Sequence, residues 1–267
     1  MILRVGWVSF VNVLPLYPAV RDLPGIALEE GVPTRLNARL AAGEIDLAPV
    51  SSIEYARRAD RYVLLPGLSI SSDGPTRSVL VASDVKIGPG ATERAVVHLT
   101  PASASSVVLL KVLAAFAWPH APGLTVTEDP AQANARLLIG DEALRELLSP
   151  THAHVVDLGE AWRNHTGLPM VFAVFAARRE AMTDGRRVAL EAAHRALLEA
   201  AANPDRATAS VEAAARLNLP LPGVREYLDG LSWNISPRHE AGLKRFLADA
   251  ARIGECPPVA DSVRAVA

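Results

Sequence analysis

The pattern of hydrophobic positions changes once along the chain, near residue 176. Before that point, short apolar runs typical of buried strands alternate with segments whose apolar residues recur every three or four positions, as in amphipathic helices. Beyond it only the helical spacing remains. Strands are predicted over 3–8, 25–32, 44–50, 62–65, 78–83, 95–99, 124–127, 135–139 and 170–176. Helices are predicted over 33–42, 53–58, 107–117, 142–148, 179–202, 204–217, 224–228 and 237–253. This order favours an α/β fold with extra C-terminal helices.

The stretch AVVHLTPASASSVVLLKVLAAFA, residues 95–117, is the clearest strand–turn–helix unit. Its turn contains Ser103, Ser105 and Ser106, directly before a helix-favouring apolar run. The start of a helix presents unpaired backbone N–H groups and the positive end of the helix dipole, which suit a carboxylate. The turn contains no GxxxxGK[ST] pattern, so a nucleotide phosphate fits poorly. An ordinary serine-capped helix would have the same pattern.

Similar polar turns follow three other predicted strands. They contain Asn12, the pair Ser51-Ser52, and the pair Gly140-Asp141. In open α/β sheets the ligand cleft lies beyond the carboxyl ends of the strands, so the four turns predict one shared site. Hydroxyl and amide groups there indicate a small, oxygen-rich, anionic ligand held mostly by neutral donors. Another hydroxyl-rich turn is expected over residues 69–74.

Composition narrows the class of protein. The chain has 267 residues, of which 50% are hydrophobic, enough for one large or two ordinary domains. A net charge of −2 gives no reason to expect nucleic acid or an anionic membrane as partner. The single cysteine, Cys256, fits a reducing compartment. The apolar N-terminal stretch lacks a charged n-region and a cleavage site, so we expect no signal peptide and a cytoplasmic protein. The oligomeric state is not readable from these features.

Several catalytic and metal-binding motifs are absent from the sequence. It contains no GxGxxG after the first strand, and no HExxH, CxxC or GxSxG. His152 and His154 are two residues apart, but no third metal ligand lies near them in the sequence. We therefore expect no metal site and no cofactor.

Taken together, six segments resemble the menaquinone-biosynthesis enzymes of the futalosine route, in particular their chorismate dehydratase branch. The segments are VSFVNVLPL (8–16), GEIDLAPVSSIEY (43–55), SISSDGPTRSVLVAS (69–83), the turn and helix over 103–111, LLIGDEAL (137–144) and DLGEAWRNHTGLPMVFAVFA (157–176). They occur in the expected order over nearly all of residues 5–176. A sister branch acts on a cyclic futalosine precursor and carries a histidine base after the strand that corresponds to 137–139. Gly140-Asp141 stands there in this chain, which favours the dehydratase.

The resemblance implies the two-lobed fold of type II periplasmic-binding proteins, with two crossover segments near 78–86 and 171–178. The first lobe would comprise 1–86 plus 173–267, and the second lobe 87–172. The family converts chorismate into 3-[(1-carboxyvinyl)oxy]benzoate and water. On this resemblance Asn12 would orient the enolpyruvyl arm, while Ser103, Ser105 and Ser106 would stabilise the ring carboxylate. The residues expected at the second carboxylate, the ring hydroxyl or elsewhere in the cleft are Ser51, Ser52, Ser78, Thr166 and Gly167.

The proton acceptor of that reaction stays open between Asp141 and the substrate's own enolpyruvyl carboxylate. Two other functions also stay open: a solute-binding protein that captures a small carboxylate without chemistry, and the sister enzyme of the same pathway. The fold alone does not separate a lyase from a binding protein.

Overall fold

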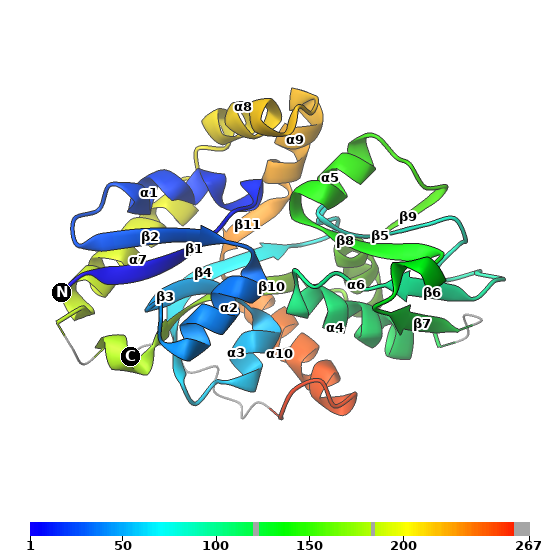
Figure 1. Ribbon diagram of the computed structural model, residues 1–267, viewed down its shortest axis with the longest axis horizontal. Coiled ribbons are helices and arrows are strands. Elements are labelled where there is room, and N and C mark those ends of the chain that lie inside the picture. Colours follow the sequence, from blue (N-terminus) through cyan, green and yellow to red (C-terminus); the bar gives the residue numbers. More distant parts are fainter. Residues whose placement is uncertain (120–122, 183–184, 259–267) are drawn as a thin grey trace.

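The computed structural model describes residues 1–119, 123–182 and 185–258. Within these ranges the strands form two sheets, with the orders β11–β4–β10–β3–β1–β2 and β7–β6–β8–β5–β9 (Figure 1). The first sheet contains β1 (Leu3–Val8), β2 (Ile26–Gly31), β3 (Leu47–Ser51), β4 (Tyr62–Ser72), β10 (Met170–Arg178) and β11 (Leu231–Asn234). The second contains β5 (Val79–Ser83), β6 (Ala95–His98), β7 (Leu124–Thr127), β8 (Ala135–Ile139) and β9 (His154–Asp157). The α/β class predicted from the sequence is confirmed.

Helices cover both sheets, and the C-terminal ones surround the first sheet (Figure 1). Those of the first two thirds are α1 (Tyr17–Arg21), α2 (Pro33–Ala42), α3 (Ser52–Arg57), α4 (Ala104–Val112), α5 (Gly140–Leu148) and α6 (Leu158–Thr166). The C-terminal ones are α7 (Arg187–Ala202), α8 (Arg206–Leu217), α9 (Leu221–Asp229) and α10 (Pro237–Arg252). Shorter turns are η1 (Val11–Leu16), η2 (Leu113–Ala117), η3 (Pro130–Gln132) and η4 (Arg179–Met182).

The strand directions bring the polar turns to one place. In the first sheet β1 runs parallel to β2 and β3, and in the second sheet β6 runs parallel to β7 and β8. The turns that follow β1, β3, β6 and β8 contain Asn12, Ser51, Ser103 and Gly140, and all four residues line one pocket between the sheets. The carboxyl ends of these strands therefore face the gap between the sheets, as the general rule for open α/β folds describes.

The chain crosses between the sheets twice, in positions that differ slightly from the expected ones. β5 pairs with β8 and β9 of the second sheet, although 1–86 was expected to belong to the first lobe. β10 starts at Met170 and pairs with β3 and β4 of the first sheet, although 87–172 was expected to form the second lobe. The connections therefore lie at 73–78 and 167–169. A buried strand such as SVLVAS has the same apolar pattern in either sheet, so the sequence does not show to which of the two sheets it belongs.

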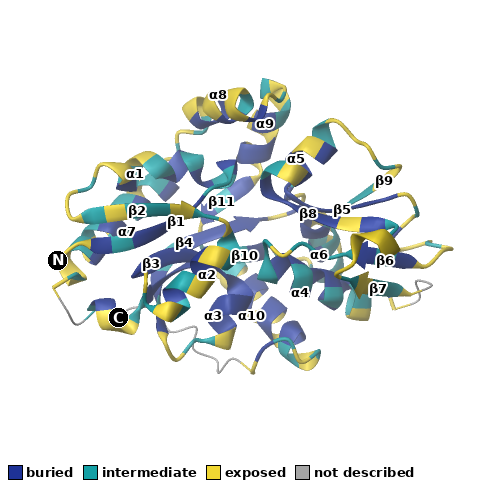
Figure 2. Cartoon of the chain, viewed as in Figure 1, coloured by how far each residue is buried: buried dark blue, intermediate teal, exposed yellow. Residues whose placement is uncertain are grey.

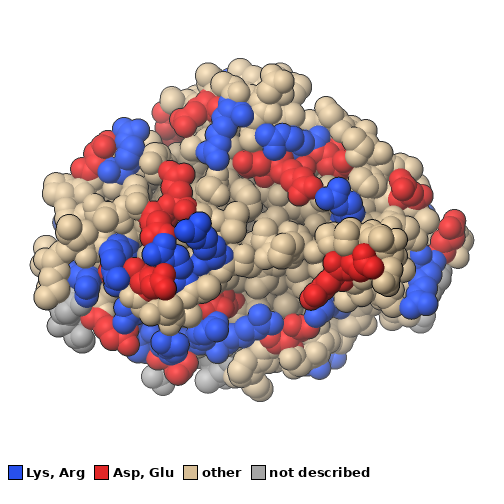
Figure 3. All heavy atoms as spheres, in the orientation of Figure 1, with Lys and Arg blue, Asp and Glu red and all other residues tan. Residues whose placement is uncertain are grey.

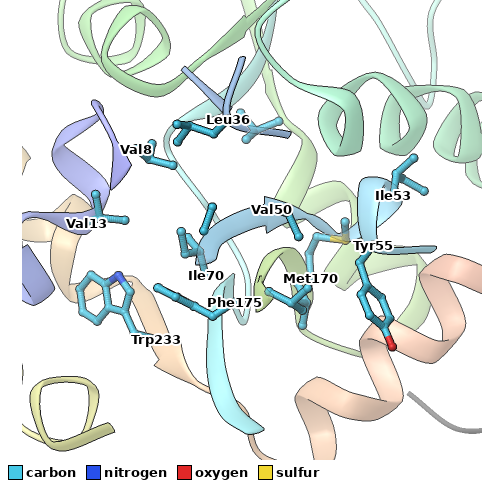
Figure 4. Packing of buried hydrophobic residues seen from close by; sticks show 14 of the residues in the cluster. Val8, Val13, Leu36, Val50, Ile53, Tyr55, Ile70, Met170, Phe175 and Trp233 are labelled. Carbon is cyan, nitrogen blue, oxygen red and sulfur yellow. The ribbon is translucent and has the colours of Figure 1, made fainter. Parts of the chain in front are cut away.

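The first sheet is built around buried strands and large aromatic side chains. β3 is buried along its whole length, and Trp7, Phe175 and Trp233 are each at most 2% exposed. Figure 4 shows Phe175 between Val50 and Trp233, and Figure 2 shows that the buried residues continue from the first sheet into the second. In α6, Trp162 makes an edge-to-face contact with Phe246 of α10, their planes inclined by 84°. A continuous core therefore supports the walls of the pocket.

Several segments differ from the pattern-based expectation: α1 and β9 were not predicted, and the helix expected over 179–202 consists, in its described part, of η4 and α7. Residues 69–72 continue β4 instead of forming a turn, because Ser69 and Ser71 donate their hydroxyl protons to backbone carbonyls of β11. β11 itself was not expected, since four residues give too short a pattern to read. Residues 158–166 form α6, which the Asp157 carboxylate caps by accepting from the N–H groups of Gly159 and Glu160.

Candidate functional site

A pocket lies between the two sheets, and none of the described residues that line it carries a charged side chain. The pocket is open to solvent on one side, and the space inside it together with its mouth is about 630 Å³. Figure 3 shows uncharged surface at the middle of this face, with charged groups around it. Polar lining residues are Asn12, Ser51, Thr76, Ser78, Ser103 and Ser106, and the apolar ones include Phe10, Ile70, Ile139, Phe172 and Leu231. Such a pocket suits a ligand that combines an apolar ring with oxygen groups.

Asn12 lies in η1, directly after β1. The indole N–H of Trp233 donates to the Asn12 carbonyl at 2.9 Å and so fixes the backbone of this turn. The side-chain Oδ1 is buried and accepts no hydrogen bond from the described residues. A buried amide oxygen without a partner is costly, so it marks a place where a donor from a ligand would fit.

Ser51 closes β3 and caps α3. Its hydroxyl oxygen accepts from the Glu54 N–H at 3.2 Å and from the Asn37 amide at 3.3 Å, which leaves the hydroxyl proton able to point into the pocket. The neighbouring Ser52 instead donates its proton to the Val171 carbonyl at 2.7 Å and does not line the pocket. The sequence alone does not show which of the two serines faces the pocket, because their side chains point in different directions and the choice depends on the residue at which β3 ends.

Ser103 caps α4 in the way that the central stretch of the sequence predicts. Its hydroxyl accepts from the Ser106 N–H at 3.2 Å and donates to the Ser106 hydroxyl at 2.8 Å. Ser106 therefore keeps its own proton to donate into the pocket, beside the first N–H groups of the helix. Ser105 faces the other lobe, where its oxygen accepts from the Ile53 N–H at 3.3 Å, and it does not line the pocket.

The connection between β4 and β5 forms a third wall. Ser78 donates its hydroxyl proton to the Thr76 carbonyl at 3.3 Å, and both residues line the pocket. The Asp157 carboxylate accepts from the N–H groups of Thr76 at 3.0 Å and Arg77 at 2.6 Å. Arg77 has a φ of 59°, the left-handed region that a non-glycine residue rarely adopts. A segment held in this conformation at a pocket wall is typical of a functional site.

Besides Ser52 and Ser105, the structure places three more predicted site residues outside the pocket. Asp141 begins α5, and its carboxylate accepts from the Val11 N–H at 3.1 Å, with burial raising the pKa of the carboxyl. Thr166 donates its hydroxyl proton to the Trp162 carbonyl at 2.8 Å, and Gly167 ends α6 with a φ of 73°. Both residues serve the end of that helix, and none of the three is among the lining residues.

Other residues at the site carry no clear signal in the sequence. Thr76 and Phe10 line the pocket and lie within segments that carry the family resemblance, but their position in the sequence does not single them out as site residues. Tyr227 of α9 does not line the pocket but lies behind Ser78; it is only 1% exposed, and its hydroxyl makes no hydrogen bond of normal geometry with the described residues. Burial raises the pKa of Tyr227, the nearby Ser78 hydroxyl lowers it, and the Asp141 carboxylate raises it further. Only the fold brings α9 to this place, so the sequence alone could not indicate Tyr227.

Two classes of feature are not found among the described residues. Over the ranges that the structure describes, no group of three or more histidine, cysteine or acidic side chains is placed to hold a metal ion. A search of the same residues finds no helix with the length and apolar character needed to cross a membrane.

Solved structures define the class of fold. The alkanesulfonate-binding protein SsuA of Xanthomonas axonopodis, bound to MOPS, has a TM-score of 0.66 at 17% identity and covers 96% of this chain and 94% of its own. A crystal structure from Archaeoglobus fulgidus has a TM-score of 0.70 at 18% identity over 94% of this chain and 97% of its own. The protein thus has the two-lobed, periplasmic-binding-protein-like fold expected from the sequence.

Sequence comparisons give the family. A family model described as menaquinone biosynthesis matches residues 3–252, and the chain belongs to that family. A chorismate dehydratase of Thermus thermophilus is 36% identical over 198 residues, 66% of this chain and 70% of the relative. Another, from Campylobacter jejuni, is 27% identical over 256 residues, 91% of this chain and 95% of the relative. The resemblance to enzymes of menaquinone biosynthesis is thereby confirmed.

Proposed function

We propose that the protein is a chorismate dehydratase of the futalosine pathway and that it binds chorismate in the pocket between its two lobes. The product would be 3-[(1-carboxyvinyl)oxy]benzoate. The observation that carries the proposal is an uncharged pocket with hydroxyl, amide and helix-start donors around an apolar wall. That lining occurs in a chain whose curated relatives are chorismate dehydratases. Chorismate needs this combination, since it has one ring and two carboxylates.

The elimination can be written with groups of the substrate and the pocket. A proton leaves the ring carbon that bears the ether, and its electron pair forms the new ring double bond. The neighbouring hydroxyl leaves as water after it takes up a proton, which the group that accepted the ring proton returns to it. The developing charge is shared with the ring carboxylate through the diene. Donors at the start of α4, with Ser103 and Ser106 beside them, would stabilise that charge without transferring a proton. The predicted contribution of Ser105 would be indirect, through its hydrogen bond to Ile53.

The other polar groups of the pocket would bind the remaining oxygen atoms of the substrate. Asn12 would orient the enolpyruvyl arm through the N–H groups of its side-chain amide, while its unpaired Oδ1 would accept from the ring hydroxyl. Ser51 would donate to the second carboxylate or to the leaving hydroxyl. Ser78 would do the same by turning its hydroxyl proton from the Thr76 carbonyl, 3.3 Å away, towards the substrate. The Asp141 carboxylate is engaged by the Val11 N–H and does not line the pocket, which supports the substrate's own enolpyruvyl carboxylate as the proton acceptor. Aromatisation of the ring favours the reaction and makes a weak base sufficient.

The direct test incubates the purified protein with chorismate and follows the aromatic product by chromatography and ultraviolet absorbance. We expect turnover by the wild type, and a loss of kcat/KM of about tenfold or more for Ser78→Ala, because one donor to a charged group contributes roughly 1.5–3 kcal/mol. Ser83→Ala is the matched control: Ser83 lies in β5, outside the pocket lining, and its hydroxyl donates to the Asn134 carbonyl. Its kcat/KM should stay within about twofold of the wild type.

Two outcomes would support the alternatives. A folded protein that binds chorismate without forming product would indicate a solute-binding protein. Turnover of the cyclic futalosine precursor in place of chorismate would indicate the sister enzyme. The cytoplasmic location and the absence of nucleic-acid partners stay predictions from the sequence.

A further inference from the structure

One hydrogen bond joins the two lobes beside the pocket. Oδ1 of Asp141, at the start of α5 in the second lobe, accepts from the N–H of Val11 in the first lobe at 3.1 Å. Val11 is the first residue of η1 and directly precedes Asn12, whose Oδ1 has no hydrogen-bond partner among the described residues. The bond therefore acts on the peptide unit next to the amide that faces the pocket.

The backbone before Asn12 is held on other sides as well. Phe10 packs against Gly140, so closely that a Cβ built on this glycine would lie 2.8 Å from the Phe10 ring. Arg216 of α8 donates to the carbonyl of Ser9. The segment 9–11 thus contacts both lobes. Among these contacts, the Asp141 carboxylate is the one that accepts a hydrogen bond from a backbone N–H of the segment. Without it, a partly buried N–H would lose its partner, which would destabilise this conformation of the segment.

We propose that Asp141 is a positioning residue. It fastens η1 to the second lobe, and through Val11 it sets the direction in which the Asn12 amide meets the substrate. This role rests on the proposed function for its effect on turnover. It replaces the alternative in which Asp141 is the base, since a base has to reach the ring proton directly.

Amide exchange and kinetics together test the proposal. Asp141→Ala removes the acceptor, so hydrogen–deuterium exchange in a peptide covering residues 9–16 should become faster, and kcat/KM for chorismate should fall by about tenfold. In Asp141→Asn the amide oxygen still accepts from Val11. Exchange and kcat/KM should then stay near the wild-type values, within about threefold. In an Asn12→Ala background, Asp141→Ala should cause little further loss, because both changes act on one amide.

A matched control removes a different contact between distant segments. Lys111 of α4 forms an ion pair of 2.6 Å with Glu255, which follows α10 and also accepts from Arg57 of α3, so the pair lies on a different set of elements from η1. Lys111→Gln should leave both the exchange of residues 9–16 and kcat/KM near the wild-type values. Circular dichroism and thermal unfolding of each variant would show that the chain is folded.

Each contrary result has one meaning. If Asp141→Asn is as inactive as Asp141→Ala while its exchange is unchanged, Asp141 is the base and the positioning role is wrong. If Asp141→Ala exchanges faster but keeps full activity, the bond does not position Asn12. If the wild type does not act on chorismate, the proposed function fails, while the exchange measurement still tests whether Asp141 fastens η1.

Discussion

The serine hydroxyls around the pocket are held by backbone groups. Ser51 accepts from a helix N–H, Ser103 accepts from the Ser106 N–H and donates to its hydroxyl, and Ser78 donates to the Thr76 carbonyl. Because these oxygen atoms are already positioned, a ligand that meets them loses little side-chain entropy on binding. Neutral donors in fixed positions can therefore hold a dianion without a lysine or arginine in the lining.

Glu146 is a second example at the residue scale, in which hydrogen bonds set the pKa of a buried carboxyl group. This buried carboxylate of α5 accepts from the N–H groups of Thr151 and His152 and from the Thr151 hydroxyl. Burial acts to raise the pKa of Glu146, but these bonds together lower it to about 2, from the ordinary value of 4.5. The ionised carboxylate is thus more stable in the folded chain than in the unfolded one.

We predict that this carboxylate contributes to acid stability. Because its folded pKa is depressed, its contribution is complete above about pH 4.5 and is lost as the pH falls towards 2. Glu146→Gln should lower the free energy of unfolding at pH 7 by roughly 1–3 kcal/mol. It should also flatten the dependence of that free energy on pH between those two values, which urea unfolding at a series of pH values would measure. An unchanged slope would contradict the assignment.

At the scale of elements, helix starts perform two tasks in this chain. Ser103 caps α4 beside the pocket, whereas Asp205 caps α8 by accepting from the Thr208 N–H at 3.0 Å, outside the pocket lining. Both caps satisfy an N–H group that the helix itself leaves unpaired. Of these two caps, only Ser103 also lines the pocket in which we propose that the substrate binds.

The pair allows stability and binding to be separated. Ser103→Ala and Asp205→Ala should each lower the free energy of unfolding, and for Ser103→Ala we expect a loss of about 1 kcal/mol. Ser103→Ala should in addition raise KM for chorismate several-fold, while Asp205→Ala should leave KM unchanged. Chemical unfolding and steady-state kinetics would check both values. Equal effects of the two variants on KM would show that Ser103 acts only as a cap.

The elements differ in how readable they are from the sequence. β1 and β3 are predicted by continuous apolar runs, and α4 by a serine turn before an apolar helix, because burial and capping leave local signals. β11 and the C-terminal half of β4 leave no such signal. Their serines look like turn residues until the other strand supplies carbonyl acceptors. The same limit applies to the site: Ser51 and Ser103 can be read from turns, but Thr76 and Tyr227 depend on how distant segments pack.

For the whole molecule, the distribution of charge is the relevant property. The net charge of −2 is small, and charged side chains surround the pocket without lining it (Figure 3). Attraction of an anionic ligand by surface charges is screened beyond a Debye length, about 10 Å at 0.1 M salt. Hydrogen bonds from fixed neutral donors are much less sensitive to salt.

We therefore predict a weak salt dependence of binding. KM for chorismate should change by no more than about twofold between roughly 0.05 M and 0.5 M sodium chloride, because no cation lines the pocket. Steady-state kinetics over that range, with the salt kept constant within each series, would measure it. A rise of tenfold or more would show that a cation from the rim, such as Arg216, moves onto the bound ligand.

The contact between Gly140 and Phe10 has a consequence for divergence within the family. Gly140 has a φ of 58°, and a methyl group added there would collide with the Phe10 ring. A histidine or any other larger residue could occupy position 140 only if position 10 became smaller in the same lineage. A lineage that gains a side chain at position 140 as a new proton acceptor therefore also needs a smaller residue at position 10. Positions 10 and 140 should thus vary together among related sequences.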